Sequence, residues 1–234
     1  MTHADIYTKF LIEYDKANVT SSYPDLTKYE IATILDKAYL ALISQKINGN
    51  NTRNASIEND VMSIEDIQPL FTRSELKTAD VEELGDVADN EYVYDLPVDM
   101  FHYVSGSAIV NKKINNIKKS FTYNNIKIIP NTVADKYKTS STNLPWIDNP
   151  VCYLENNNLR VLVDAYNKID NVSVNIEYVK FPKGFTQNIS NPSVDFELND
   201  SAAEELINLA IVMSLEIVES PRLDSKIKTL SLES

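Results

Sequence analysis

The chain has 234 residues, a formal net charge of −12, one cysteine and two histidines. A single cysteine excludes an intrachain disulfide, and these counts also exclude a thiolate-based structural zinc site and a histidine-rich metal centre. The acidic balance is opposite to that of a general nucleic-acid binder, although acidic walls allow DNA to slide through a tunnel. Acidity that serves only solubility is the simpler interpretation.

The sequence also bears on membranes and secretion. No apolar stretch approaches the ~18 uncharged residues of a spanning helix. The first five residues lack the basic start and apolar core of a secretory signal. We therefore expect the chain to be cytosolic where it is made.

Two helices are predicted near the N-terminus. Apolar residues recur at every fourth position through residues 3–17, which is typical of a helix with one buried face. A second helix is predicted from Thr27 to Asn48, because Thr27 and Glu30 form a capping box and Gly49 is a strong stop. The short connection predicts that the two helices pack as an antiparallel pair.

The next two segments are less regular. Residues 52–72 show a weaker helical pattern with a new start at Ser63, and Pro69 limits its length. Residues 75–95 carry eight acidic residues against one lysine, Lys77. We interpret part of this second segment as an exposed acidic stretch or loop.

A strand-rich region follows. Residues 91–96 alternate between apolar and polar side chains, which is the period of a strand. Three asparagines at 156–158 predict a hairpin turn, because asparagine accepts positive φ. The polar, proline-containing stretch 130–149 is predicted to be a loop. Further strands are predicted at 103–110, 120–129, 151–155, 159–164 and 172–181.

The last element is a helix over about 200–219, with Ser201 and Glu204 as its expected capping box. Residues 206–215 contain no charge. A helix that is apolar nearly all round must be covered on nearly all sides, either by its own fold or by a neighbouring subunit. A polar tail is predicted for 220–234.

The segregation of helices, strands and a final helix favours an α+β class. We expect N- and C-terminal helices to form a helical bundle with an inserted antiparallel β domain. The expected parts are a helical part with the acidic segment at 1–90, a β-rich domain at 91–198, a helix at 199–219 that completes the bundle, and a tail at 220–234.

Catalytic motifs are absent from the sequence, and we predict a protein that is not an enzyme, with no cofactor and no metal. Asp99 and His102 with Ser105 or Ser107 would form a nucleophilic set if residues 97–102 were helical. That spacing is common by chance, so we interpret Asp99 as a turn cap. Cys152 lies between apolar strand residues, which favours a packed thiol over a reactive one.

A basic segment offers a sharper hypothesis. Four lysines lie within residues 111–120, which is opposite in sign to the acidic segment before them. A solvated hairpin tip is the simple alternative; we expect instead that the lysines contact an acidic surface of a neighbouring subunit or partner ring. The full set of expected interface residues is Lys112, Lys113, Lys118, Lys119, Glu82, Glu83, Asp86, Leu206, Leu209, Met213, Ile217, Arg222 and Leu223.

Several stretches, in their order along the chain, resemble a known family. They are DIYTKFLIEYDKAN at 5–18, YPDLTKYEIATILDKAY at 23–39, YDLPVDMF at 94–101, VNIEYVKFP at 174–182 and SAAEELINLAIVMSLE at 201–216. This order resembles the head-to-tail adaptor, or connector ring, proteins of tailed bacteriophages, and is most similar to ring proteins of crAss-like phages.

The resemblance implies a structural virion protein at the portal vertex. About twelve copies would close into a ring that connects the capsid portal to the tail and lets double-stranded DNA pass through its lumen. The implied partners are copies of the chain, the portal protein and other tail or ring proteins, with no membrane. The implied location is the virion, and the host cytoplasm during assembly. The alternative is a β-rich module that binds carbohydrate or protein, with some of the thirteen tyrosines lining its binding face.

Overall fold

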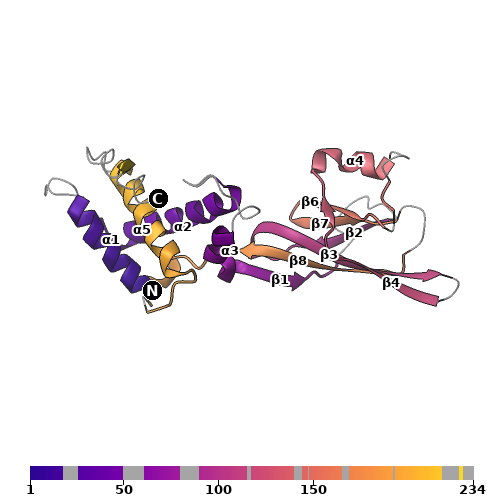
Figure 1. Cartoon of the computed structure of the whole chain (residues 1–234), viewed down its shortest axis with the longest axis horizontal. Helices are drawn as coiled ribbons and strands as arrows, with labels where there is room; N and C mark the ends of the chain where they lie inside the picture. The colour runs from indigo at the N-terminus through magenta and orange to yellow at the C-terminus, as the bar shows by residue number, and fades with distance from the viewer. Residues whose placement is uncertain are drawn as a thin grey trace. The chain divides into compact units, whose positions relative to one another are not determined.

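A computed structural model describes residues 1–17, 26–49, 61–79, 90–114, 117–139, 144–146, 148–164, 169–191, 193–217 and 227–228. The chain divides into two compact units (Figure 1). Unit 1 consists of Met1–Leu70 and Pro182–Ser234, and unit 2 of Phe71–Phe181. The unit boundaries therefore fall at 70/71 and 181/182, whereas the sequence placed domain boundaries at 90/91 and 198/199.

Unit 1 is helical in its described part. Its long helices are α1 (His3–Ala17), α2 (Lys28–Asn48) and α5 (Asp200–Ile217). Its short elements are α3 (Val61–Ile67) and the 3-10 turns η1 (Gln68–Leu70) and η3 (Thr186–Asn188). Helix α5 packs against both α1 and α2, and α3 and η3 also pack on α2. In Figure 1, α1 and α5 run alongside each other while α2 runs across them.

Capping explains where the long helices begin and end. Thr27 and Glu30 form the predicted capping box at the start of α2, and Gly49 ends it in the left-handed conformation with φ 72°. At α1, the Asp5 amide donates to the Thr2 hydroxyl, and the Thr2 amide donates to the Asp5 carboxylate. The expected cap of α5 by Ser201 is wrong: Asn199 caps this helix, since its side-chain oxygen accepts from the Ala202 amide at 2.7 Å.

A buried ion cluster joins three helices of unit 1. The Lys46 ammonium on α2 lies 2.7 Å from Asp66 Oδ2 on α3 and 2.7 Å from Glu205 Oε2 on α5. Burial alone would lower the pKa of Lys46, but the hydrogen bonds and charges of the two carboxylates raise it above its usual value. The lysine is therefore charged, and removing it would leave a buried carboxylate without its cation.

Asp36 joins η3 to α2 in the same unit. Its carboxylate accepts hydrogen bonds from the backbone amides of Phe185 and Thr186 and from the Thr186 hydroxyl. Phe185 then packs with Phe196 and Tyr39 beside α2. The segment that enters unit 1 from unit 2 is thus held by both polar and aromatic contacts.

The described part of unit 2 forms two four-stranded sheets. One has the strand order β1 (Phe71–Glu75), β8 (Asn171–Lys180), β3 (Met100–Ile114) and β4 (Ile117–Tyr123). The other has the order β2 (Glu91–Asp95), β7 (Asn158–Leu162), β6 (Val151–Glu155) and β5 (Lys127–Ile128). All neighbouring strands are antiparallel except β5 and β6, which are parallel.

The two sheets share one hydrophobic core. Alternate residues of β8 point into it, since Val172, Val174 and Ile176 are all buried. Cys152 and Val161 of the second sheet belong to the same cluster. The helix α4 (Asn131–Thr139) covers the other side of this second sheet, with Ala134 packing against Val151 and Tyr153. The unit is therefore a β-sandwich with one helix on its outside.

The expected fold class, an α+β bundle of terminal helices with an inserted antiparallel β domain, is wrong. The described residues form a mixed α/β structure of five helices and eight strands, and the terminal helices do not form a bundle. Helices α1 and α2 face each other across a cavity instead of packing as the expected antiparallel pair. The β part is not wholly antiparallel, and the stretch 130–149 contains α4 where a loop was predicted.

The ion cluster gives a stability prediction. We expect Lys46→Met to lower the free energy of unfolding by about 3 kcal/mol, because Asp66 would stay buried without its cation. The matched control is Lys9→Met, whose partner Glu204 lies on α5 in an exposed pair, and we expect a loss below about 1 kcal/mol. Urea unfolding followed by circular dichroism measures both, and equal losses would contradict the role given to Lys46.

Candidate functional site

A two-stranded arm extends from the first sheet of unit 2. Asn111 of β3 pairs with Asn171, the first residue of β8, so β3 beyond this point pairs only with β4. We call residues 112–114 and 117–119 the lysine arm. Figure 1 shows it as the free end of the β3–β4 pair. At its base, the Ser120 hydroxyl donates to Asn111 Oδ1 at 2.7 Å.

The register of the arm places lysines opposite lysines. Lys112 pairs with Lys119, and Lys113 pairs with Lys118. Residues directly opposite each other in an antiparallel pair share a face, so the two lysine side chains of each pair start side by side. Like charges in this position destabilise a hairpin. Repulsion between opposite lysines therefore lowers the stability of the arm.

The four lysines do not have the same surroundings. Lys112 lies 3.5 Å from the Asp164 carboxylate, and their side chains are only 13% and 2% exposed. Lys112 therefore serves its own fold, which corrects its expected place at an interface. Lys113, Lys118 and Lys119 are exposed. Within the described ranges no carboxylate forms an ion pair with any of these three.

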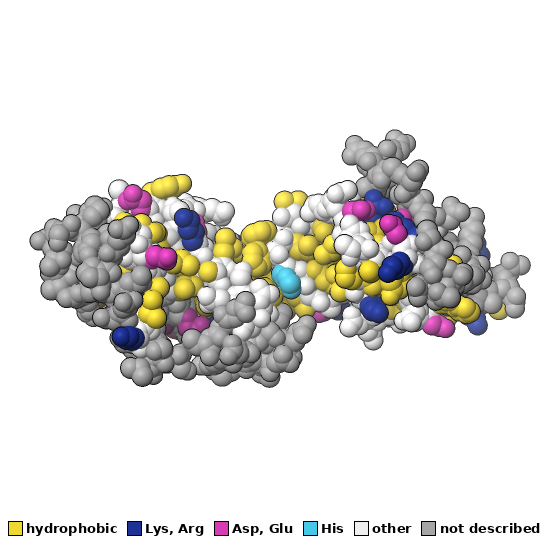
Figure 2. Space-filling model, turned by 90° about the horizontal axis from the view of Figure 1, so that it is seen from above, with side chains coloured by type: hydrophobic (Ala, Val, Ile, Leu, Met, Phe, Trp, Pro, Cys, Tyr) yellow, Lys and Arg dark blue, Asp and Glu magenta, His cyan; other side chains and the backbone are white. Residues whose placement is uncertain are grey.

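Helix α5 carries a second exposed feature. Leu206 is fully buried inside unit 1, so it is not available to a partner as the sequence suggested. Leu209 and Met213 are partly exposed, and Ile217 is 61% exposed. These last three residues are spaced by four and therefore lie along one side of the helix, and we call them the α5 stripe. On the face of unit 1 seen in Figure 2, hydrophobic side chains lie exposed between scattered charged ones.

The remaining expected interface residues cannot be placed. Glu82, Glu83, Asp86, Arg222 and Leu223 lie outside the described residues. The described residues therefore offer two separate candidate surfaces, the lysine arm of unit 2 and the α5 stripe of unit 1.

The catalytic set considered from the sequence is not assembled. Residues 97–99 are not helical, and His102 lies in β3. Asp99 accepts a hydrogen bond from the Tyr178 hydroxyl at 3.0 Å, and Ser105 donates to Glu177 at 3.2 Å. Burial lowers the pKa of His102. In the described part of the chain, no hydrogen bond joins His102 to Asp99 or to Ser105.

Cys152 is a packed thiol, as its apolar strand predicted. It is fully buried in the core between the sheets. Burial raises its pKa to about 11, although the Tyr103 hydroxyl 3.7 Å away acts in the opposite direction. The thiolate needed for nucleophilic attack is therefore scarce at neutral pH.

Sequence reasoning missed a buried charged cluster in unit 2. The carboxylate of Glu91 accepts from the Tyr153 hydroxyl at 2.5 Å and lies 3.1 Å from both Arg160 and Lys138. Arg160 also pairs with Glu155 at 2.9 Å. Two acids and two bases balance, and Lys138 comes from α4. The cluster is therefore suited to anchoring α4 on the sheet. The sequence carries no signal for it, because Glu91 alternates with Tyr92 and Tyr94 and so falls on the polar side of the predicted strand.

Two further findings concern metals and membranes. Among the described residues, no three potential metal-ligating side chains come together. None of the helices in those ranges is long and apolar enough to cross a membrane. In comparisons with known proteins, no protein-family model and no curated protein matches the chain.

The arm predicts stability changes of opposite sign. We expect Lys113→Glu to raise the free energy of unfolding by about 0.2–1 kcal/mol, because a cross-strand attraction with Lys118 replaces a repulsion. We expect Lys112→Met to lower it by about 1–3 kcal/mol, because the buried Asp164 loses a cation. Thermal and urea unfolding measure both. A loss of stability in Lys113→Glu would show that the repulsion is not felt.

Proposed function

We propose that the chain is a non-enzymatic structural subunit that assembles with copies of itself into a ring at the portal vertex of a tailed phage. In this role the ring joins the capsid portal to the tail, and double-stranded DNA passes through its lumen. The resemblance of five ordered sequence stretches to phage adaptor proteins supports the placement of the ring at a portal vertex. The observation that carries the proposal for assembly is the lysine arm.

The arm is suited to an acidic partner surface. Three exposed lysines project on a two-stranded ribbon, and Lys113 lies opposite Lys118 although an acidic residue at either position would replace the repulsion by an attraction. The chain as a whole has 34 acidic against 22 basic residues, so a second copy supplies the complementary charge. A contact between an arm and a different surface of the next copy is head-to-tail, and such contacts form a ring where the rotation between copies closes.

The α5 stripe supports the same partner. Leu209, Met213 and Ile217 continue the apolar surface of α5 beyond the part covered by α1 and α2. Burial of this stripe against a neighbouring copy would remove apolar surface from water, at about 25 cal/mol per Å². One side of α5 would then pack inside unit 1 and the other against a neighbouring copy, which accounts for its apolar residues on both sides.

The alternative of a carbohydrate-binding module receives less support. A polar groove of about 250 Å³ in unit 2 is lined by Arg73, Ser105, Ser107, Asn124, Asn175 and Glu177. Its lining contains no aromatic side chain on which a sugar ring would stack. Among the described residues, the exposed Trp146 instead lines a second groove of unit 2, of about 540 Å³, together with Tyr137. That groove is the feature that favours the alternative.

Charge reversal of the arm tests the proposal. The variant combines Lys113→Glu, Lys118→Glu and Lys119→Glu and leaves Lys112 in place for Asp164. We expect at least a tenfold weaker assembly by mass photometry, and loss of rings of about twelve copies in negative-stain images, alone or on portal protein. The matched control reverses the exposed Lys37, Lys77 and Lys136, with the same change of net charge.

The control separates arm contacts from general repulsion. Equal weakening in both variants would assign the effect to net charge and reject the arm as the contact. Rings that persist in the arm variant would also reject it. If subunit assembly survives and only DNA retention falls, the arm faces DNA instead of a neighbouring copy.

A second prediction concerns the α5 stripe. We expect Ile217→Asp to weaken assembly while leaving the unfolding free energy of the monomer within about 0.5 kcal/mol, because the side chain is exposed. Leu206→Ala is the contrasting variant, since it should destabilise the monomer by about 2–5 kcal/mol. Sedimentation velocity and urea unfolding measure the two effects. Unchanged assembly of Ile217→Asp would remove the stripe from the interface.

A further inference from the structure

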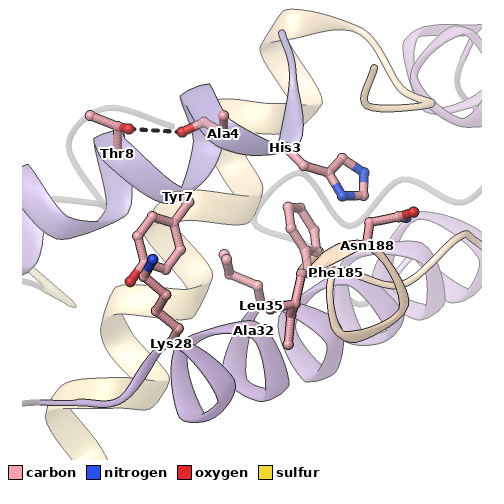
Figure 3. A pocket seen from close by; sticks show the side chains of 10 residues that line it. His3, Ala4, Tyr7, Thr8, Lys28, Ala32, Leu35, Phe185 and Asn188 are labelled. Carbon is pink, nitrogen blue, oxygen red and sulfur yellow. Dashed lines mark hydrogen bonds between the residues drawn. The ribbon is translucent and has the colours of Figure 1, made fainter. Parts of the chain in front are cut away.

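A cavity of about 210 Å³ lies between α1 and α2 in unit 1. One wall is formed by Ala4, Tyr7 and Thr8 of α1, and the opposite wall by Lys28, Ala32 and Leu35 of α2. Phe185, Asn188 and Ile189 contribute from the segment around η3, and His3 completes the lining. Figure 3 shows His3, Phe185 and Asn188 at one end of the cavity, and Tyr7 with Lys28 at the other.

His3 is the unusual member of this lining. The residue is only 4% exposed, and neither of its ring nitrogens has a hydrogen-bond partner among the residues that the structure describes. The ring itself is held firmly, because it stacks on Phe185 with a centroid distance of 4.3 Å. A buried donor or acceptor without a partner costs about 1–3 kcal/mol. Such a group is retained most readily where an occupant of the cavity supplies the missing hydrogen bond.

The imidazole is suited to a neutral ligand. Burial lowers the pKa of His3, against weaker opposing effects from Asp36 and Glu197. Neutral imidazole offers one N–H donor and one nitrogen acceptor. It therefore pairs with a hydroxyl or an N–H group without requiring a counter-charge.

The size and walls of the cavity restrict the occupant further. A volume of about 210 Å³ exceeds that of a cavity that takes benzene, ~150 Å³, and is below the ~300 Å³ of sites for drug-sized molecules. The buried part of the lining other than His3 is apolar and consists of Ala32, Leu35 and Phe185. The polar lining residues Thr8, Lys28 and Asn188 are exposed or only partly buried. A single ring with one polar group matches this space.

We propose that this cavity is a binding site for a small aromatic molecule of the phenol or indole class, with its hydroxyl or N–H hydrogen-bonded to His3. The ring lies between the apolar faces of α1 and α2, and the polar group reaches the imidazole. The bound molecule fills the space that keeps these two helices from packing directly. This inference is independent of the ring assembly proposed above and concerns a site within one copy.

The test uses the full chain with phenol, indole and benzene as probes. Long-range ¹H–¹⁵N spectra of histidine-labelled protein report the His3 nitrogens directly, and His3→Phe identifies their signals. We expect phenol and indole to shift these signals saturably and to bind about fivefold more tightly than benzene, which cannot hydrogen-bond. The midpoint temperature of thermal unfolding should rise as phenol or indole saturates the site.

Two variants locate the site. His3→Phe keeps the stack on Phe185 and removes both nitrogens, so phenol should bind it no better than benzene does. Ala32→Leu fills the cavity and should abolish binding of all three probes. Ile12→Leu, on α1 and away from the cavity lining, is the control and should bind phenol as the unchanged protein does.

The contrary outcomes are distinct. Absence of any shift of the His3 signals at millimolar phenol would mean that His3 binds only water, and would overturn the proposal. Equal affinity for phenol and benzene would reject the hydrogen bond to His3. Binding that survives in folded Ala32→Leu would place the ligand elsewhere. If Ala32→Leu does not fold, the comparison of probes on the unchanged protein and on His3→Phe still decides.

Discussion

Burial of α5 is the constraint on which unit 1 depends. This helix packs on both α1 and α2, and its buried residues, among them Leu206 and Ile211, leave no exposed surface on that side. Lys46 then fixes the direction of packing, because it must lie between Asp66 and Glu205 to be neutralised. Apolar burial supplies the free energy, and the ion cluster selects one arrangement among many that would bury similar area.

Charged residues in the interior and in the lysine arm have contrasting surroundings. In the interior, each charge has a close partner: Lys46 contacts two acids, and Glu91 contacts a tyrosine and two cations. At the lysine arm, cations face cations and three of them have no acidic partner among the described residues. Interior pairs follow from the high free energy of an isolated buried charge. The exposed lysines of the arm are solvated and need no such partner. What supports the proposed contact with an acidic surface is that Lys113 lies directly opposite Lys118.

Local sequence signals predicted elements whose causes are themselves local. The capping box of Thr27 and Glu30 sets the start of α2, and Gly49 sets its end. The turn after β6 depends on Asn156 and Asn157, whose φ values are 49° and 64°. The helix α4 was missed because its stretch is rich in polar residues and lies next to prolines. It is stabilised by packing of Ala134 on the sheet and by Lys138 at Glu91, contacts that no local pattern displays.

By itself, the sequence determined the long helices of unit 1, most of the strands of unit 2, the packed state of Cys152 and the basic character of residues 112–119. These properties depend on neighbours within a few positions, where spacing and side-chain type are sufficient. Only the tertiary structure decided that the terminal helices do not form a bundle, that Leu206 and Lys112 serve the interior, and that His3 borders a cavity. Each of these depends on contacts between residues far apart in the chain, such as Lys112 with Asp164 or His3 with Phe185. The same local pattern is compatible with several such pairings, and which of them has the lowest free energy depends on the packing of the whole fold.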